Sequence, residues 1–467
     1  MPHTTDALAR FEATLRDQPD PIAAIAAGQI GKDRTFDGRF GPRKLVYADY
    51  VASGRALRQV EEFVMEQVLP FYANSHTEQS FCGATMTRMR EAARAVIAAK
   101  CGAEADTHAV IFSGAGATSG LNQLVHLFSI KDAVARGEVV TVLHGPYEHH
   151  SNLLPWRESG AQVVEIAEAR GGGVDLDHLQ RELDRSTAHG PVICAFSAAA
   201  NVTGVCTDVA AVTKVAKAAG ARIVWDYAGG GPYLPVSMTA FGAIDAIVLS
   251  PHKFIGGPGA SGVLIVRRDT VSATTPSRPG GGTVAFVNAH RHDYVSRLEQ
   301  REEGGTPNVI GDIRAALALI VKDVIGQDFI TARNAALTAR AMAAWGDDPA
   351  IGLLAADRAE RLPILSFVPR GPDGNRLDHV QFTTDLSDHF GIQARGGCSC
   401  AGPYVHHLLA IDDGLSDKIR AGILSGDTTS KPGFVRLNLS YLMDDETVDF
   451  ILQSVPALAK GRGAMAA

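Results

Sequence analysis

The stretch DAIVLSPHKFIGGPGAS, residues 245–261, decides the fold class, because a continuous apolar run ends in polar residues and a glycine-rich turn. A short apolar run bounded by turn signals is typical of a strand buried on both faces of a parallel sheet. Lys253 comes directly after this run, with Ser250 and His252 beside it. A lysine in this position is expected to be desolvated, which lowers its pKa and makes its amine a nucleophile toward carbonyl groups. The weaker alternative is a lysine that extends from a loop into solvent.

Six further apolar runs of this kind lie along the chain, separated by segments with helical spacing. They are HAVIF (108–112), EVVTVL (138–143), AQVVEI (161–166), PVICAFS (191–197), ARIVWD (221–226) and SGVLIV (261–266). Residues 176–186 and 209–220 have helical spacing, and Gly220 is expected to end the second of these helices. Buried strands alternating with helices predict an α/β fold with a mainly parallel seven-stranded sheet.

The last third of the chain has a different texture. A long helical pattern covers 309–326, and a helix-rich stretch continues to Trp345. Three more apolar runs follow: LPILSFV (362–368), HVQFTT (379–384) and FVRLNLS (434–440). These runs predict a smaller C-terminal α/β domain. The expected organisation is an N-terminal segment (1–45), a large domain (46–310) and a small domain (311–467).

The composition excludes several classes of function. Of 467 residues, 46% are hydrophobic and 20% are charged, and the formal net charge is −7. This charge, with no basic run, gives no basis for nucleic-acid binding, and no apolar stretch is long enough to span a membrane. The first residues lack a basic segment followed by an apolar one, so no secretory signal is expected. We therefore expect a cytoplasmic protein whose six cysteines are reduced thiols.

The segments that follow the strands should carry the function, since ligands of such sheets bind just past the carboxyl ends of the strands. SGAGATSGLN (113–122) follows HAVIF as a glycine-rich turn that opens a helix. Backbone N–H groups and the helix dipole favour a phosphate there, and Thr118 adds a hydroxyl. Alone this signal is weak, because many glycine turns hold no ligand.

Three other strand ends carry polar groups. EHHSN (148–152) offers a histidine that could stack on a flat ligand, although a single histidine is more often structural. Asn201 follows PVICAFS, and Asp226 ends ARIVWD, where a buried carboxylate needs a cationic partner such as a protonated ring nitrogen. A phosphate cradle, a stacking histidine, an amide, an acid and a desolvated lysine together describe a site for pyridoxal 5′-phosphate.

A series of motifs runs along most of the chain, from about Tyr47 to Asp449. They are YADYVASG (47–54), GATSGLN (116–122), EHHSN (148–152), NVTG (201–204), WDYA (225–228), SPHK (250–253), EEGGTPN (302–308) and RGGCSCAGP (395–403). In this order they resemble the class V aminotransferase family of fold-type I pyridoxal-phosphate enzymes. Within it, the chain is most similar to the cysteine desulfurase and selenocysteine lyase branch.

The resemblance implies roles in cofactor binding. Lys253 is the expected Schiff-base lysine, Asp226 pairs with the pyridine nitrogen, and His149 stacks on the ring. The phosphate is expected to contact the Ala117 backbone and the side chains of Thr118, Ser250 and His252. Thr306 is expected to reach the phosphate in the partner subunit, which implies a homodimer with shared active sites.

The resemblance also implies how the substrate is bound and attacked. Asn201, which also borders the cofactor, and Arg436 would hold the substrate carboxylate, a task suited to a guanidinium fork. Cys400 matches the thiol that takes sulfur from cysteine as a persulfide and releases alanine, from where a sulfur-acceptor protein could receive it. Arg395 would contact substrate and lower the pKa of a nearby thiol. Cys398 is a neighbouring thiol able to resolve the persulfide as a disulfide or to accept it.

Two departures keep other functions open. Gly229 stands where desulfurases commonly have a glutamine or histidine that binds the phenolic oxygen of the cofactor, and residues 398–399 replace a frequent histidine pair. The alternative is another class V reaction, such as transamination, epimerisation or a different lyase step, in which the thiols are incidental.

A metal-binding or redox module is the third possibility, from a different functional class. Its ligands would be Cys398, Cys400, His406 and His407. Neither C-x-C nor adjacent histidines match common zinc spacing, so we expect no metal.

Overall fold

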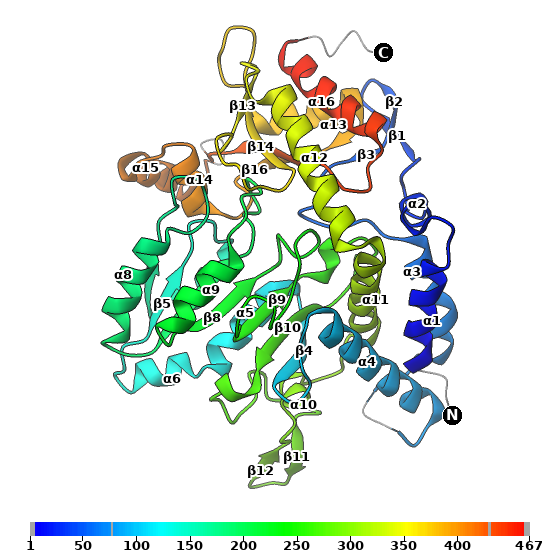
Figure 1. Ribbon diagram of the computed structural model, residues 1–467, viewed down its shortest axis with the longest axis vertical. Coiled ribbons are helices and arrows are strands. Elements are labelled where there is room, and N and C mark those ends of the chain that lie inside the picture. The colour runs from blue at the N-terminus through cyan, green and yellow to red at the C-terminus, as the bar shows by residue number, and fades with distance from the viewer. Residues whose placement is uncertain (1–4, 76–77, 428–430, 462–467) are drawn as a thin grey trace.

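A seven-stranded sheet forms the centre of the protein (Figure 1). The computed structural model describes residues 5–75, 78–427 and 431–461. The strand order is β4-β10-β9-β8-β7-β5-β6. Strands β6, β5, β7, β8 and β9 pair in parallel, and β10 is antiparallel to both β4 and β9. The bounds are β4 (His108–Gly114), β5 (Thr141–His144), β6 (Gln162–Glu165), β7 (Val192–Ser197), β8 (Arg222–Asp226), β9 (Ala246–Leu249) and β10 (Gly262–Arg267). The predicted mainly parallel seven-stranded sheet is confirmed.

Each strand of this sheet contributes alternate side chains to two cores on opposite faces. In β9, Ile247 and Leu249 join the first core, whereas Ala246 and Val248 join the second. This period-two alternation of apolar residues on both faces explains the continuous apolar runs. The first core is covered by α4 (Phe81–Lys100), α8 (Leu176–Thr187), α9 (Val209–Ala218) and α11 (Val309–Ile325). The second is covered by α5 (Gly116–Leu127), α6 (Ile130–Ala135), α7 (Leu154–Arg157) and α10 (Leu298–Glu302).

The N-terminal helices pack on the first core through Leu8, Phe11 and Ile25. They are α1 (Thr5–Arg16), α2 (Pro21–Ala27) and α3 (Arg58–Phe63). Two small hairpins lie outside the main sheet: β1 (Thr35–Gly38) with β2 (Gly41–Lys44), and β11 (Val284–Val287) with β12 (His292–Tyr294). Among the described residues, no helix is both long enough and apolar enough to cross a membrane.

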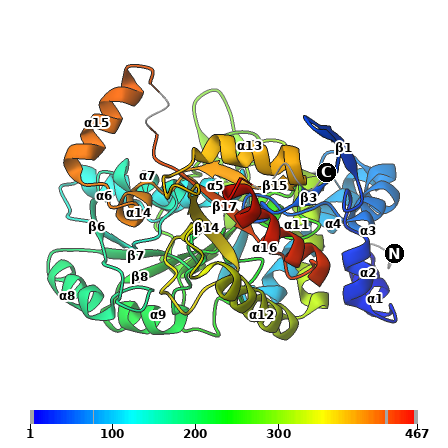
Figure 2. The same cartoon turned by 90° about the horizontal axis from the view of Figure 1, so that it is seen from above.

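A second sheet, in the order β13-β14-β17-β16, lies at the other end of the molecule. Its strands are β13 (Ile351–Leu353), β14 (Ile364–Pro369), β16 (Arg395–Gly397) and β17 (Phe434–Asn438). Helices α12 (Gln327–Trp345), α13 (His379–Phe390) and α16 (Asp445–Ala459) share its core. Helix α14 (Gly402–Leu408) follows the thiol loop, and α15 (Asp413–Leu424) projects from the body in Figure 2 and buries no residue.

The interpretation of HVQFTT (379–384) as an apolar run of the strand type is wrong, because these residues form the first half of α13. Phe382, Leu386 and Phe390 recur every four residues, and all three are buried in the second sheet's core. The Asp378 side chain accepts a hydrogen bond from the Gln381 amide and caps the helix. Helical spacing therefore outweighs the short alternation of apolar and polar residues.

Helix α11 packs on the first core along its length and is followed by α12, which belongs to the core of the second sheet. Val46 and Ala48 also join the core of the second sheet, and β3 (Val46–Tyr47) pairs in parallel with β15 (Ile392–Gln393). The domain boundaries at 45/46 and 310/311 stay predictions.

Candidate active site

A cavity of about 290 Å³ lies where the parallel strands end and the second sheet begins. Every residue that the sequence analysis singled out for catalysis or for binding cofactor or substrate lines it, with two exceptions. Thr306 is exposed on the loop before α11, and the neighbouring thiol Cys398 also lies outside the cavity lining. The predicted residues that it brings together are Ala117, Thr118, His149, Asn201, Asp226, Ser250, His252, Lys253, Arg395, Cys400 and Arg436. Convergence of residues up to 319 positions apart follows from the topology, because the ends of parallel strands share one edge.

The N-terminus of α5 forms one end of the cavity, named the phosphate end after the contacts predicted there. Gly114 and Gly116 have positive φ angles, and a Cβ at Gly116 would lie 2.9 Å from Ser250 Oγ and 3.1 Å from His252 Cε1. The Ala117 amide donates to Ser250 Oγ at 3.0 Å. No side chain caps the helix at Ala115, so the first N–H groups other than that of Ala117 can bind an anion.

Lys253 and Asp226 lie at the ends of neighbouring strands. Burial lowers the pKa of Lys253 to about 8, so a substantial fraction of its amine is neutral near physiological pH. Asp226 is 3% exposed, and its Oδ1 accepts a hydrogen bond of 2.7 Å from the Ala228 amide. Burial raises the pKa of Asp226, and the nearby Lys253 ammonium opposes this shift. A protonated ring nitrogen would stabilise the buried carboxylate in the same way.

His149 is held as a neutral ring beside them. Its Nδ1 accepts a hydrogen bond of 3.1 Å from the Ser151 amide, which leaves the proton of the neutral ring on Nε2. Burial, with Lys253 nearby, lowers the pKa of His149 to about 4. Burial likewise lowers the pKa of His252 to about 4. Neutral imidazoles add no charge to a cavity that already contains lysine and two arginines.

The substrate end of the cavity contains an incompletely bonded guanidinium. Arg436 is 3% exposed; its Nη1 donates to the Asn201 carbonyl at 3.0 Å and its Nη2 to Asp49 Oδ1 at 3.0 Å. Arg436 Nε and Asn201 Oδ1 are buried without a hydrogen-bond partner among the described residues. Buried polar atoms are normally satisfied, so the unpaired Arg436 Nε donor indicates an acceptor such as a carboxylate oxygen, and the unpaired Asn201 Oδ1 indicates a donor on a ligand.

The thiol loop is a tight turn with unusual backbone angles. Ser399 and Cys400 both have positive φ, 51° and 54°, and the Ala401 amide donates to the Cys398 carbonyl at 3.4 Å. A non-glycine residue with such angles destabilises the fold by about 1–3 kcal/mol, so this conformation persists only where surrounding contacts hold it. Here Asn201 Nδ2 donates to the Ser399 carbonyl at 2.8 Å. Cys400 is exposed at the cavity, whereas Cys398 packs against the apolar cluster around Tyr404.

Three residues that belong to the site were missed from the sequence. Asp49 bonds both arginines, Ser151 Oγ bonds Thr118 Oγ1 at 2.7 Å, and Glu148 accepts hydrogen bonds from Ser197. Burial raises the pKa of Glu148 to about 7. Asp49 and Glu148 lie inside the motifs YADYVASG and EHHSN. An acidic residue next to apolar or site residues could have been identified from these motifs, because a buried carboxylate needs hydrogen-bond or ionic partners.

The metal-site alternative receives no support from the described residues. His406 Nδ1 bonds the Gly402 carbonyl at 2.7 Å, and His407 is directed toward Glu168 at 3.9 Å. No group of three histidine, cysteine or acidic side chains in the described part of the chain could hold a metal ion. Among the described residues, Cys398, Cys400, His406 and His407 therefore do not form a metal-ligand set.

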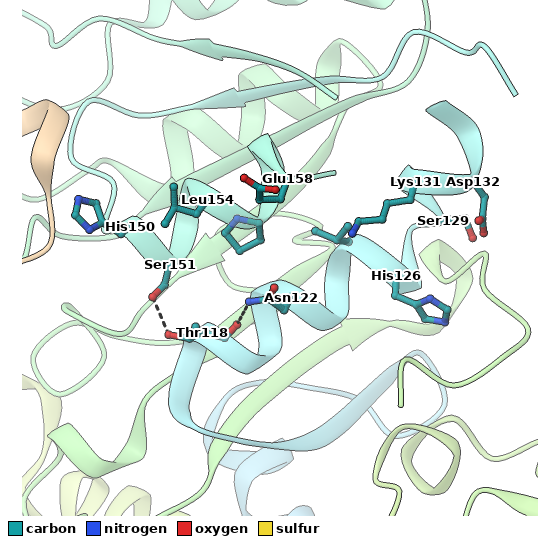
Figure 3. A pocket seen from close by; sticks show the side chains of 12 residues that line it. Thr118, Asn122, His126, Ser129, Lys131, Asp132, His150, Ser151, Leu154 and Glu158 are labelled. Carbon is teal, nitrogen blue, oxygen red and sulfur yellow. Dashed lines mark hydrogen bonds between the residues drawn. The ribbon is translucent and has the colours of Figure 1, made fainter. Parts of the chain in front are cut away.

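A second, larger cavity of about 530 Å³ borders the phosphate end of the site (Figure 3). Thr118 and Ser151 line both cavities, and their hydrogen bond lies between the two. The outward face of α5 forms one side and α7 the other, with Lys131 and Glu158 among the charged residues that line it. The second cavity is therefore adjacent to this end of the site, with the Thr118–Ser151 hydrogen bond between them.

The arrangement fits a flat, phosphorylated cofactor. An uncapped helix N-terminus with a close-approach glycine can bind its phosphate, neutral His149 can face its ring, and Asp226 and Lys253 can bind its nitrogen and aldehyde. Gly229 lines the same cavity, but a Cβ there would lie 3.1 Å from the Ala199 carbonyl. No side chain at position 229 reaches the ring, which is one respect in which this site differs from the expected pattern.

Fold and site together define an enzyme of the fold-type I pyridoxal-phosphate class. A family model described as Aminotransferase class-V matches residues 46–450, and the chain belongs to this family.

Several proteins similar to this chain in sequence or in structure are described as cysteine desulfurases. The chain is 32% identical over 380 residues to a probable cysteine desulfurase of Aeropyrum pernix, covering 77% of this chain and 86% of that protein. It is 28% identical to a cysteine desulfurase of Enterobacter sp. (strain 638), covering 77% and 85%. Among solved structures, an apo cysteine desulfurase of Thermococcus onnurineus superposes with a TM-score of 0.72 at 24% identity, covering 89% of this chain and 95% of that one. At that identity, the structural likeness concerns the fold.

Proposed function

We propose that this protein is a pyridoxal-phosphate-dependent cysteine desulfurase or selenocysteine lyase that transfers the substrate's sulfur to Cys400. The observation that carries the proposal is that one cavity contains a desolvated lysine, a carboxylate-binding arginine and an exposed thiol. The named activity of the sequence relatives agrees with it.

The chain supplies distinct groups for holding the cofactor. Lys253 would bind its aldehyde, Asp226 would keep its ring nitrogen protonated, and His149 would pack on its ring. The α5 N-terminus would bind its phosphate together with Thr118, Ser250 and His252. When bound, this cofactor supplies an electron sink for bonds broken at the substrate's α- and β-carbons.

The substrate would be oriented by its carboxylate. Arg436 Nε would donate to one carboxylate oxygen. Asn201 Nδ2, which already donates one hydrogen to the Ser399 carbonyl, would donate its second hydrogen to the other. This contact directs the side chain of the amino acid toward the thiol loop, whose backbone Asn201 also holds. Binding energy from the unreactive end of the substrate is thus used to position the sulfur.

Sulfur transfer then requires Cys400 as a thiolate. The thiolate attacks the substrate's sulfur, an S–S bond forms, and the Cβ–S bond breaks with its electron pair remaining on carbon. Protonation of that carbon yields alanine, and Cys400 carries a persulfide. Lys253 lines the same cavity, and its pKa, lowered to about 8 by burial, suits it to supply that proton.

Two partner interactions belong to the same proposal. A homodimer would bring Thr306 of one subunit, which is exposed here, to the phosphate end of the other. A sulfur-acceptor protein would collect the persulfide, for which the exposure of Cys400 gives access.

The test is a product assay on the purified holoenzyme. L-cysteine or L-selenocysteine with a reductant should give alanine together with sulfide or selenide in equal amounts. Transfer of the amino group to a keto acid, or racemised substrate without alanine, would instead establish another class V reaction and refute the desulfurase proposal.

A further inference from the structure

Two arginines face each other at the substrate end of the cavity. Arg395 and Arg436 are directly opposite on the antiparallel strands β16 and β17. Like charges in such a cross-strand pair repel each other. Both side chains line the cavity, Arg436 almost fully buried and Arg395 half exposed. Without a counter-charge, the pair would present two positive charges to a bound molecule.

Asp49 supplies that counter-charge. Its Oδ1 accepts from Arg436 Nη2 at 3.0 Å, and its Oδ2 lies 3.0 Å from Arg395 Nε and 2.9 Å from Arg395 Nη2. Both contacts of Arg395 go to one oxygen, and its guanidinium is thereby turned toward Asp49. Asp49, Arg395 and Arg436 together carry a net charge of +1.

Backbone hydrogen bonds hold the segment that carries Asp49 between β15 and β17. The Ala48 amide donates to the Gln393 carbonyl at 3.0 Å, and the Ala48 carbonyl accepts from the Asn438 amide at 2.7 Å. Tyr47 Oη donates to the Asp49 carbonyl at 3.1 Å. Because the segment is bonded on both sides, the backbone fixes the position of Asp49 next to the two arginines.

We propose that Asp49 is a specificity-determining residue that favours amino acids with one carboxylate over those with a second acidic group. A pocket with one excess positive charge is neutralised by one α-carboxylate. A second anionic group would meet the Arg395 guanidinium, whose charge is already paired with Asp49. Combined with the proposed function, on which the identity of the substrate rests, this predicts a preference for cysteine over cysteine sulfinate.

Inert carboxylates test this selection without any sulfur chemistry. In the holoenzyme, binding of propionate and of succinate is measured by calorimetry for the parent protein and for Asp49→Asn. The ratio of the succinate Kd to the propionate Kd should fall at least tenfold in Asp49→Asn, because Arg395 becomes free to bind the second carboxylate. Asp49→Glu should retain the parent's ratio, and so should Asp37→Asn, which removes an exposed acid outside the cavity.

An unchanged ratio in Asp49→Asn, or equal weakening of both ligands, would overturn the proposal and leave Asp49 a structural residue. If Asp49→Asn does not retain the cofactor, Arg395→Gln is used instead, because it removes one positive charge where Asp49→Asn removes one negative charge. Arg395→Gln should weaken the binding of succinate more than that of propionate, and equal weakening of the two ligands would overturn the proposal. A parent enzyme that releases alanine from neither cysteine nor selenocysteine would refute the proposed function, whereas the two binding ratios could still be measured and compared.

Discussion

The backbone amide of His150 donates a hydrogen bond of 2.8 Å to the carbonyl of Cys400. The His150 side chain adds a second link, since its Nε2 accepts from the Gly402 amide at 2.9 Å. These bonds join the loop after β5, which also carries His149, to the turn that carries the thiol. The two neighbouring histidines therefore have different tasks, one toward the cavity and one toward the thiol loop.

Replacement of His150 by alanine should impair the thiol without disturbing the cofactor. Without Nε2 the Gly402 amide loses its acceptor, and the strained turn at 399–400 is held less firmly. The rate of sulfide release should fall roughly tenfold or more, as expected for a misplaced reacting group. Visible absorbance of the cofactor, recorded on the same sample, should be unchanged; a rate equal to the parent's would show that the backbone bond alone positions Cys400.

The lowered pKa of Lys253 should appear in the pH dependence of cofactor loading. Only the neutral amine attacks an aldehyde, so loading of the apoprotein is slow below the pKa and rises as pH passes through it. Burial sets this midpoint at about 8 rather than at the usual lysine value of 10.5. Stopped-flow absorbance across a pH series measures it, and a midpoint near 10.5 would mean that the amine is fully hydrated.

Gly116→Ala should weaken the phosphate site specifically. The substitution imposes a positive φ of 64° on alanine and places its Cβ 2.9 Å from Ser250 Oγ. We expect a loss of about 1–2 kcal/mol in the free energy of unfolding from the backbone angle and a cofactor affinity reduced roughly tenfold.

Gly137→Ala is the matched control for this change. Its φ is 85°, but no atom lies within 4 Å of the added Cβ. Urea unfolding should show a similar loss of stability for both variants, whereas only Gly116→Ala should bind the cofactor less tightly. Equal cofactor affinity in the two variants would argue against a phosphate at α5.

The functional residues at the strand ends could be predicted from the sequence, because each one follows closely after the apolar run that forms its strand. Parallel topology then brings those groups to one edge, as it does for Asp226 and Lys253. Asp49 could not be assigned in this way, since its partner Arg436 lies 387 residues further along the chain and their contact depends on the second sheet. HVQFTT was misread because its helical period becomes visible only when Leu386 and Phe390 are included.

Trapping the sulfur on the enzyme tests the central claim most directly. The holoenzyme is treated with L-cysteine without reductant, and its peptides are examined by mass spectrometry. The account predicts one additional sulfur atom on Cys400, no such adduct and no alanine in Cys400→Ser, and an adduct at the parent's level in Cys398→Ser. Alanine formation by Cys400→Ser at the parent's rate would contradict the assignment of Cys400 as the sulfur acceptor.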